Sequence, residues 1–429
     1  MEKKSKRKIY WRKLDDQAKV FALASNKRYS SIFRLSIILK EKIEIEILQK
    51  AVELSLEKYK AFKVKMKKGL FWYYFEENKK QPIIDIENEY PFKKINTIEN
   101  NDYLFKVTYF DNKINIDFFH VLTDGNSGEE FLKEIIYKYL ELKHPKEIKV
   151  IDGIEEQIFE DSENAYEKNY KKHVSKSNLF SKKAYMIQGE ELDKGKIGIN
   201  HFKINLEDIK SCTKAKECSI SMYLVAMIAY SIYETNFKIN KGNKPINICV
   251  PINLKKYFKS ETISNFFSYM IINLNLKNYK EYSFNEILDI VKKEFERKLK
   301  FEKIIETVSS DVGMTNNILI RIIPLFLKKI IVRICSLEVK KHFTITFSNI
   351  GKFEINEKYS KYIENFLVIL SPDWAEKIKC GVCSYENNLM VTFGTILKDN
   401  LIESKFRDLL KEKNIEFLIE GNEVNVISS

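Results

Sequence analysis

The sequence predicts an α/β protein with mixed sheets, arranged as two lobes with a cleft between them. Residues 1–150 alternate between strand-like and helix-like segments, and residues 197–429 repeat that alternation. Residues 151–196 carry runs of opposite charge with little apolar periodicity. We therefore expect an N-terminal lobe at 1–150, an exposed connector at 151–196 and a C-terminal lobe at 197–429.

The elements of the first half follow from residue type and period. β-branched and aromatic runs predict strands, apolar residues at helical spacing predict helices, and the dipeptides Lys68-Gly69 and Asp111-Asn112 predict tight turns. In order we expect a strand at 29–39, a helix at 45–59, a hairpin of 62–67 with 70–75, a hairpin of 103–110 with 113–119, and a helix at 129–142.

The second half is read in the same way. Ser219 is a suitable N-cap for an apolar helix that follows it. In order we expect a strand at 198–206, a helix at 219–233, strands at 245–250 and 267–276, a helix at 284–301, strands at 343–347, 366–370 and 389–397, and a helix at 401–413.

Composition narrows the class of protein. The chain has 429 residues, 44% of them hydrophobic, and a net charge of +13. The basic residues comprise 65 lysines and only 8 arginines, whereas sequence-specific nucleic-acid binding relies on arginine. The basic start at 1–8 leads into no apolar run of the signal-peptide kind. We expect a cytoplasmic protein that binds no nucleic acid.

The six cysteines predict free thiols. Cys380 and Cys383 have the spacing of zinc and redox sites, yet no second pair matches them, and a strand-like segment follows. We expect two strand residues and no metal site.

The segment 318–335 (ILIRIIPLFLKKIIVRIC) begins at Ile318 and ends at Cys335. Its four basic side chains fall on one narrow arc of a helix and leave a wide apolar face. Packing on a core is the expected arrangement. A helix that lines an acyl channel, or a peripheral contact with an anionic membrane, are the alternatives.

The sequence has one loop of catalytic character, Phe118-Phe119-His120-Val121-Leu122-Thr123-Asp124-Gly125. It lies between a predicted strand and a predicted helix, where α/β proteins place residues that face a crevice. A histidine there suits a general base at neutral pH. Asp124 could hold the loop by an ion pair, and Gly125 would let the backbone turn where a Cβ would clash.

His120-x-x-x-Asp124-Gly125 resembles the HHxxxDG motif of the chloramphenicol-acetyltransferase-like superfamily, which includes alcohol acetyltransferases, BAHD acyltransferases and condensation domains. Three further segments are similar to the alcohol-acetyltransferase-like branch: 10–18 (YWRKLDDQA), 250–267 (VPINLKKYF…TISNFF) and 344–351 (TITFSNIG). The resemblance spans nearly the whole chain.

The resemblance implies a two-lobed fold with a channel at the lobe interface, where His120 is the general base and Asp124 a structural residue. It implies Ser348 or Asn349 as donors to the oxyanion and Asn265 as a substrate-binding residue. Lys255 stands where related enzymes have the arginine that pairs with the motif aspartate. A Ser-Asn-x-Gly turn at a strand end is an equally good interpretation of Ser348 and Asn349.

The implied reaction is acyl transfer from an acyl-CoA or acyl-carrier thioester, a co-substrate and not a bound cofactor, to an alcohol. An amide-forming condensation enzyme and a non-catalytic binding protein of the same fold are the alternatives. Phe119 replaces the first histidine of the motif. The acceptor and the oligomeric state are left open by the sequence.

Overall fold

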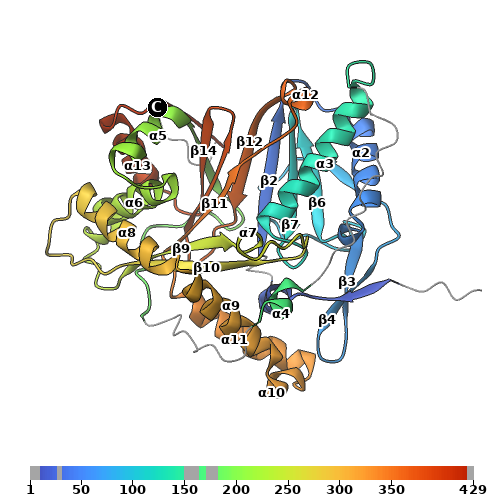
Figure 1. Cartoon of the computed structure of the whole chain (residues 1–429), viewed down its shortest axis with the longest axis horizontal. Helices are drawn as coiled ribbons and strands as arrows, with labels where there is room; N and C mark the ends of the chain where they lie inside the picture. Colours follow the sequence, from blue (N-terminus) through green and yellow to red (C-terminus); the bar gives the residue numbers. More distant parts are fainter. Residues whose placement is uncertain (1–9, 27–30, 149–163, 171–181, 423–429) are drawn as a thin grey trace, which may run out of the picture.

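The computed structural model describes residues 10–26, 31–148, 164–170 and 182–422. Two lobes, each a sheet with helices, lie side by side, with the N-terminal lobe at the right of Figure 1 and the C-terminal lobe at the left. The described residues form sheets of five, three and seven strands. The predicted α/β architecture with mixed sheets is confirmed.

The five-stranded sheet of the N-terminal lobe has the order β12-β2-β7-β6-β5. Its strands are β12 (Ile363–Leu370), β2 (Ile32–Leu39), β7 (Lys113–Phe119), β6 (Phe105–Phe110) and β5 (Ile84–Ile86). Helices α2 (Ile45–Lys58) and α3 (Gly125–Lys143) contribute their apolar stripes to the core of this lobe. Phe118, the penultimate residue of β7, is fully buried there, so the strand that leads to His120 is firmly anchored.

A three-stranded sheet, β1-β4-β3, completes the N-terminal lobe. It consists of β1 (Trp11–Lys13), β4 (Tyr73–Glu77) and β3 (Val64–Lys68), and the short helix η1 (Lys60–Phe62) precedes β3. The predicted hairpin is confirmed. Helix α1 (Asp16–Ala24), which the periodicity did not predict, begins after Asp15.

The C-terminal lobe contains a seven-stranded mixed sheet of order β10-β9-β11-β13-β14-β8-β15. Its strands are β10 (Phe267–Leu274), β9 (Ile246–Asn253), β11 (Ile345–Lys352), β13 (Ile378–Tyr385), β14 (Asn388–Thr395), β8 (Gly198–Asn205) and β15 (Phe417–Gly421). Strand β11 runs parallel to β9 and β13, and the other pairs are antiparallel.

Helices cover one face of this sheet. They are α5 (Leu206–Ala215), α6 (Ile220–Ile232) with its π-helical extension η2 (Tyr233–Phe237), α8 (Phe284–Lys298) and α13 (Leu401–Glu412). Ser219 is the N-cap of α6, as predicted, because its side chain accepts a hydrogen bond from the backbone of Met222. The unpredicted α5 has a short apolar stripe between charged residues.

The opposite face of the seven-stranded sheet is turned toward the N-terminal lobe. Side chains alternate along a strand, and cross-strand partners share a face. Cys249 of β9 and Thr346 of β11 are cross-strand partners and therefore share a face. Ser348 follows Thr346 by two residues on β11. Ile350 Cγ2 lies 3.3 Å from the position that a Cβ on Gly125 would occupy, which shows that this face meets the His120 loop.

Strand β12 corrects the predicted lobe boundary. Residues 197–429 were expected to form the C-terminal lobe, yet β12 pairs with β2 and is the edge strand of the N-terminal sheet. It lies so close to the C-terminal sheet that a Cβ on Gly381 would stand 2.3 Å from the carbonyl oxygen of Val368. A local strand pattern carries no information on which sheet the strand joins.

The connector is also corrected. Within the described part of 151–196, Ala165 and Tyr166 of helix α4 (Ala165–Lys168) are buried. The Tyr166 hydroxyl accepts a hydrogen bond from the backbone N–H of Phe267 at 2.9 Å, so this segment covers the start of β10 and is not an exposed linker. Residues 151–163 and 171–181 lie outside the described residues.

Helices α9 (Phe301–Asn316), α10 (Ile318–Arg321) and α11 (Leu325–Lys340) lie at the bottom of Figure 1. Ile304, Val308 and Val312 of α9 belong to the core of the C-terminal lobe, and Leu325 of α11 belongs to that of the N-terminal lobe. Core packing was expected for 318–335, but most apolar side chains of α11 are exposed, and that expectation is wrong. Pro324 precedes α11 and separates it from α10. Among the described residues, none of the helices is long and apolar enough to span a membrane.

The remaining short helices complete the chain. Helix α7 (Lys255–Phe258) follows β9, and α12 (Glu357–Ser360) precedes β12. The segment between α7 and β10 is irregular and runs toward the N-terminal lobe, where it meets the loop that carries His120.

Candidate active site

His120 directly follows the last residue of β7. Its backbone N–H donates to the carbonyl of Ser31 at 2.9 Å, which continues the pairing with β2 by one residue. The chain then turns, and α3 begins at Gly125 with Asp124 as the N-cap. The Asp124 side chain accepts a hydrogen bond from the backbone N–H of Ser127 at 3.0 Å, so the loop is fixed at both ends.

Three aromatic rings surround the imidazole of His120. Phe21 of α1 stacks on it at a centroid distance of 4.6 Å, and Phe33 of β2 and Phe267 of β10 lie at 4.9 and 5.3 Å. Burial among these rings lowers the pKa of His120, because an imidazolium loses its hydration there. The neutral imidazole, which can accept a proton, is therefore the form favoured at pH 7.

Asn265 determines which nitrogen of His120 carries the proton. The Asn265 Nδ2 group donates to the His120 carbonyl at 3.1 Å and to Asp15 Oδ2 at 3.1 Å, and both partners accept only. The amide is thereby oriented with Oδ1 toward His120 Nδ1, 3.1 Å away. Because Oδ1 can only accept, Nδ1 must be the donor, and Nε2 retains the free lone pair.

Asp15 is a site residue that sequence reasoning did not identify. Its Oδ1 accepts from the backbone N–H of Ala18 at 2.7 Å, as the N-cap of α1, and its Oδ2 accepts from both nitrogens of Asn265. Burial raises the pKa of Asp15 to about 6, so the carboxylate form prevails at neutral pH. The sequence feature that could have identified Asp15 is its position in the segment 10–18, between a short strand and a helix.

Arg12 supports the same corner of the site. Its guanidinium is buried, donates to the carbonyl of Ala61 at 3.0 Å and lies near Ser264. Burial lowers the pKa of Arg12 to about 10, while the charge of Asp15 opposes that shift. The charge of the buried carboxylate is thus partly balanced by a buried cation.

The structure contains the ion pair between Asp124 and Lys255, with 2.9 Å between Oδ1 and Nζ. Lys255 also donates to the Ser127 hydroxyl. Asp124 Oδ2 accepts from the backbone N–H of Phe266 at 2.9 Å. The partners named for this carboxylate lie in α3, in α7 and in the segment before β10.

Thr123 completes a clasp between the two lobes. Its hydroxyl donates to the carbonyl of Ile263 at 2.9 Å. His120, Thr123 and Asp124 thus each bind one residue of the short segment that runs from Ile263 to Phe266. Two motifs about 140 positions apart in the sequence therefore hold each other in the fold.

Gly125 lies where there is little room for a side chain. It is the first residue of α3, and its φ lies outside the left-handed region that favours glycine. A Cβ there would come 3.3 Å from Ile350 Cγ2. The close approach of β11 agrees with the expected lack of room for a Cβ, whereas the backbone here does not adopt the left-handed conformation.

The two candidate oxyanion donors differ in orientation. Asn349 donates through Nδ2 to the Ser221 hydroxyl at 3.1 Å and accepts from the backbone N–H of Gly351 at 2.9 Å. Its side chain is thus engaged with α6 and with its own turn, as the alternative interpretation predicted. Ser348 lies on the face of β11 that is turned toward the N-terminal lobe. Between residues in the described parts of the chain, no hydrogen bond joins either side chain to His120.

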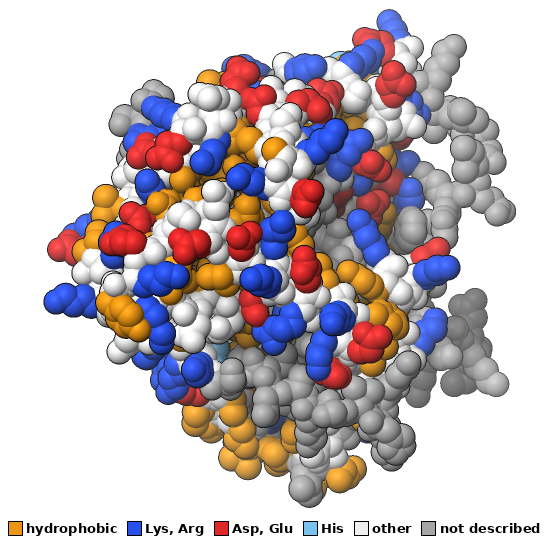
Figure 2. Space-filling view, turned by 60° about the vertical axis from the view of Figure 1, so that its left-hand side comes forward, with side chains coloured by type: hydrophobic (Ala, Val, Ile, Leu, Met, Phe, Trp, Pro, Cys, Tyr) orange, Lys and Arg blue, Asp and Glu red, His pale blue; other side chains and the backbone are white. Residues whose placement is uncertain are grey.

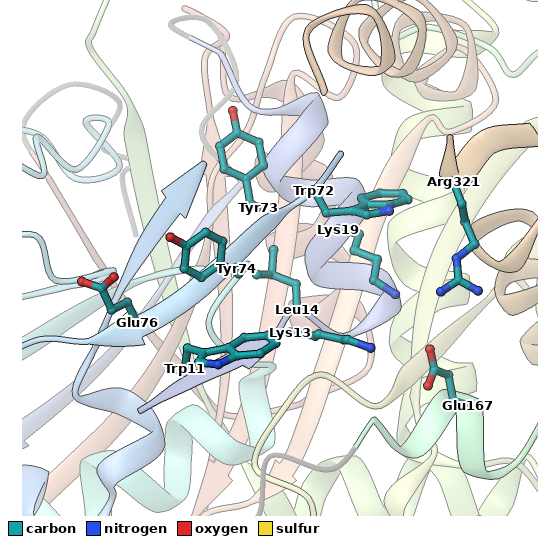
Figure 3. A pocket seen from close by; sticks show the side chains of 10 residues that line it. All are labelled: Trp11, Lys13, Leu14, Lys19, Trp72, Tyr73, Tyr74, Glu76, Glu167 and Arg321. Atoms are coloured by element: carbon teal, nitrogen blue, oxygen red, sulfur yellow. The ribbon is translucent and has the colours of Figure 1, made fainter. Parts of the chain in front are cut away.

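Two cavities lie next to these elements. The first, of about 580 Å³, is lined by residues that include Trp11 of β1, Lys19 of α1, Arg321 of α10 and Trp72, which directly precedes β4; Figure 3 shows these side chains around the cavity. The second, of about 390 Å³, is lined in part by Phe119. Phe119 also packs on the apolar cluster between the lobes. The residue that replaces the first histidine of the motif therefore lines the second cavity.

No group of three or more potential metal ligands occurs among the described residues. Cys380 and Cys383 are both buried within β13, as the strand interpretation predicted. Burial raises the pKa of each thiol well above its usual value, and a protonated thiol is a poor nucleophile and metal ligand.

Comparison of the whole chain with known proteins gives likeness in structure alone. No family model matches the sequence, and no curated protein matches it. The fold is similar to TRI3 trichothecene 15-O-acetyltransferase from Fusarium sporotrichioides, at a TM-score of 0.64 and 9% identity over 96% of each chain.

Two further structures are similar over nearly the whole chain. TRI101 of F. sporotrichioides complexed with coenzyme A and T-2 gives a TM-score of 0.61 at 8% identity, covering 95% of this chain and 99% of that one. The first condensation domain of the calcium-dependent antibiotic synthetase gives 0.57 at 10% identity, with 95% and 99% covered. The chain therefore has the two-lobed fold of the chloramphenicol-acetyltransferase-like proteins.

Proposed function

We propose that this protein is an acyltransferase that moves an acyl group from an acyl-CoA or acyl-carrier thioester to an acceptor hydroxyl, with His120 as the general base. The observation that carries the proposal is the orientation of Asn265, which leaves His120 Nε2 unprotonated. The fold, shared with an O-acetyltransferase and with a protein complexed with coenzyme A, supports the same class of reaction.

The proposed steps need only one proton carrier. His120 Nε2 takes the hydroxyl proton as the acceptor oxygen attacks the thioester carbonyl, which forms a tetrahedral oxyanion. The oxyanion then collapses, the carbon–sulfur bond breaks, and the imidazolium returns the proton to the leaving thiolate. The products are the ester and the free thiol, and the neutral Nδ1–H form of His120 is restored.

We assign Ser348 as the donor to the oxyanion. It lies on β11 two residues before Ile350, whose side chain approaches Gly125 beside the His120 loop. Asn349 is less suited because its amide already binds Ser221. A single preorganised donor of this kind is worth about a hundredfold to a thousandfold in rate.

The charges around the two cavities suit a polyanionic co-substrate such as coenzyme A. Lys13, Lys19 and Arg321 line the first cavity with Glu76 and Glu167. The second cavity is lined by Lys68, Lys94 and Lys329 with Asp102. Both cavities therefore have more basic than acidic lining residues, which favours phosphate groups.

The test is release of free thiol from acetyl-CoA or a longer acyl-CoA in the presence of a panel of alcohols and amines. We expect His120→Ala to lower the rate about a thousandfold. The matched control is His144→Ala, which removes another partly buried histidine that stacks on an aromatic ring, Tyr362, at 4.4 Å.

Full activity of His120→Ala would overturn the mechanism. Transfer to amines alone would assign the protein to amide formation. Wild-type protein that binds the donor and releases no thiol with any acceptor would leave the non-catalytic binding protein as the correct interpretation.

A further inference from the structure

Helix α11 is oriented with its apolar face outward. Phe326 is 67% exposed and Ile334 65% exposed. With α10 and the turn between the helices they form a continuous set of large exposed apolar residues, named here the α10–α11 face: Ile318, Ile322, Phe326, Leu327, Ile330, Ile331, Ile334 and Leu337. The exposure of this many large apolar side chains in one place indicates a protein-binding or membrane-binding surface.

The basic side chains of α11 hold this orientation. Lys328 is only 1% exposed, donates to the carbonyl of Phe71 at 2.9 Å and lies 3.4 Å from the centroid of the Trp72 ring. Lys329 Nζ is 3.3 Å from the Tyr73 hydroxyl, and Arg333 donates to the carbonyl of Ser25 at 2.9 Å. Lys328, Lys329 and Arg333 thus direct their charged ends toward the protein, so the apolar side is left for another partner.

The β3–β4 hairpin extends the same surface. The backbone N–H of Leu325 donates to the carbonyl of Leu70 at 2.9 Å, which places the hairpin tip at the start of α11. Leu70 is 73% exposed, and Phe71, Lys67 and Lys68 are exposed beside it. The tip therefore presents two lysines and two large apolar side chains next to the α10–α11 face.

The charge of this surface decides between its possible partners. Between Ile318 and Leu337 the sequence has no acidic residue, and Arg321, Lys67 and Lys68 are exposed around the apolar side chains. In Figure 2, turned from Figure 1 about the vertical axis, apolar side chains gather at the bottom of the molecule, the end where Figure 1 places α10 and α11. A second copy would bring like charges together, whereas an anionic surface would attract them.

We propose that the α10–α11 face and the tip of the β3–β4 hairpin attach this protein to the surface of an anionic phospholipid membrane. An interfacial helix lies in the membrane plane with its apolar face in the boundary between headgroups and acyl chains. Here Phe326, Ile330 and Ile334 enter that boundary, and Lys67 and Lys68 bind lipid phosphates. The attachment is peripheral and reversible.

The experiment is cosedimentation of the full chain with vesicles of phosphatidylcholine that contain 30% phosphatidylserine, by design, and with vesicles of phosphatidylcholine alone. We expect binding to the anionic vesicles that weakens as the salt concentration rises. The variant Phe326→Ser/Ile330→Ser/Ile334→Ser lowers the partition coefficient on the order of 100-fold. The control Ile98→Ser/Ile239→Ser/Tyr279→Ser changes three apolar side chains elsewhere that are at least as exposed, and it leaves binding unchanged.

The lysines are tested separately. Lys67→Gln/Lys68→Gln lowers binding to the anionic vesicles about 25-fold, which is about fivefold for each positive charge removed near the surface. Lys214→Gln/Lys216→Gln, two exposed lysines at the end of α5, is the matched control and has no such effect.

Three results would overturn the proposal. They are no binding of the wild-type chain to anionic vesicles, equal loss of binding in the apolar variant and in its control, and a dimer in solution that the apolar variant abolishes without any vesicle binding. The last result would assign the face to self-association.

Discussion

The His120 loop and the α10–α11 face both depart from the rule that polar groups lie outside and apolar groups inside, in opposite ways. Around His120, buried polar groups form a network in which Asp15, Asn265, Asp124 and Lys255 each bind named partners. On α11 the cation of Lys328 is turned inward and Phe326 is turned outward. In the first region the partners lie within the chain, and in the second Phe326, Ile330 and Ile334 are more than half exposed.

The difference shows what each region is built to do. A buried polar network restricts geometry, because each group that loses its partner is costly to keep away from water. That restriction suits a base whose reactive nitrogen must be defined. An exposed apolar face does not restrict the geometry of its surroundings. It lowers the free energy only when a second surface removes it from water.

The largest effect is expected where the ion pair between Asp124 and Lys255 is broken. Lys255→Met leaves the carboxylate of Asp124 buried without its cation, and we expect the free energy of unfolding to fall by about 3–5 kcal/mol. Chemical denaturation monitored by circular dichroism measures it. Lys255→Arg restores the charge and should recover most of the loss.

The exposed pair Lys361–Glu147, at 56% and 55% exposure, provides the control. Lys361→Met should change the stability by no more than about 1 kcal/mol. If the two methionine variants lose the same stability, the Asp124–Lys255 pair contributes no more to the free energy of unfolding than an ordinary surface pair.

The next effect concerns the orientation of the base. Asn265→Ala removes the acceptor that keeps the proton on His120 Nδ1, and we expect kcat to fall about a hundredfold with a folded protein, in analogy with the loss of a residue that fixes a catalytic tautomer. Steady-state thiol release and circular dichroism measure the two quantities.

The pH profile adds a readout that a purely structural role would not change. Burial lowers the pKa of His120, so activity should be lost only as pH falls below 6.5. The hydrogen bond to Asn265 raises that pKa, so its removal moves the acid limb to still lower pH. An acid limb that stays in place in the variant would contradict the assigned contact.

The smallest effect is expected at Lys328. Lys328→Met keeps the packing on Trp72 and removes the buried charge, so stability should change by less than about 1.5 kcal/mol. Burial lowers the pKa of Lys328 to about 8, from 10.5. Below pH 8 the Lys328 amine is protonated in both the folded and the unfolded state. Between pH 8 and 10.5 the folded state binds fewer protons than the unfolded state. The wild type therefore gains stability relative to the variant as the pH rises through this range. Thermal unfolding at pH 7.5 and 10 tests the sign, and a gain for the variant would contradict it.

The sequence predicted the local parts of the site well. The strand that ends at Phe119, the motif from His120 to Gly125 and the helix after it follow from residue type and period within about 25 positions. The strand interpretation of Cys380 and Cys383 was confirmed for the same reason. Local pattern is sufficient where an element is defined by its own residues.

The sequence could not predict partnerships between distant segments. Asn265 was only a weak candidate and Asp15 was missed, although together they determine the proton position on His120. No local pattern places residue 15 beside residue 265. The assignment of β12 to the N-terminal sheet was missed for the same reason.

By itself the sequence determined the predicted elements and their order, though not α1 or α5, and the histidine that follows a strand end, because these depend on short-range periodicity and turn chemistry. Only the tertiary structure decided which nitrogen of His120 is free and which side of α11 faces outward. Periodicity shows that a helix has two unlike faces. Which of them meets the protein depends on the partners of Lys328 and Arg333, and these come from segments more than 250 residues away.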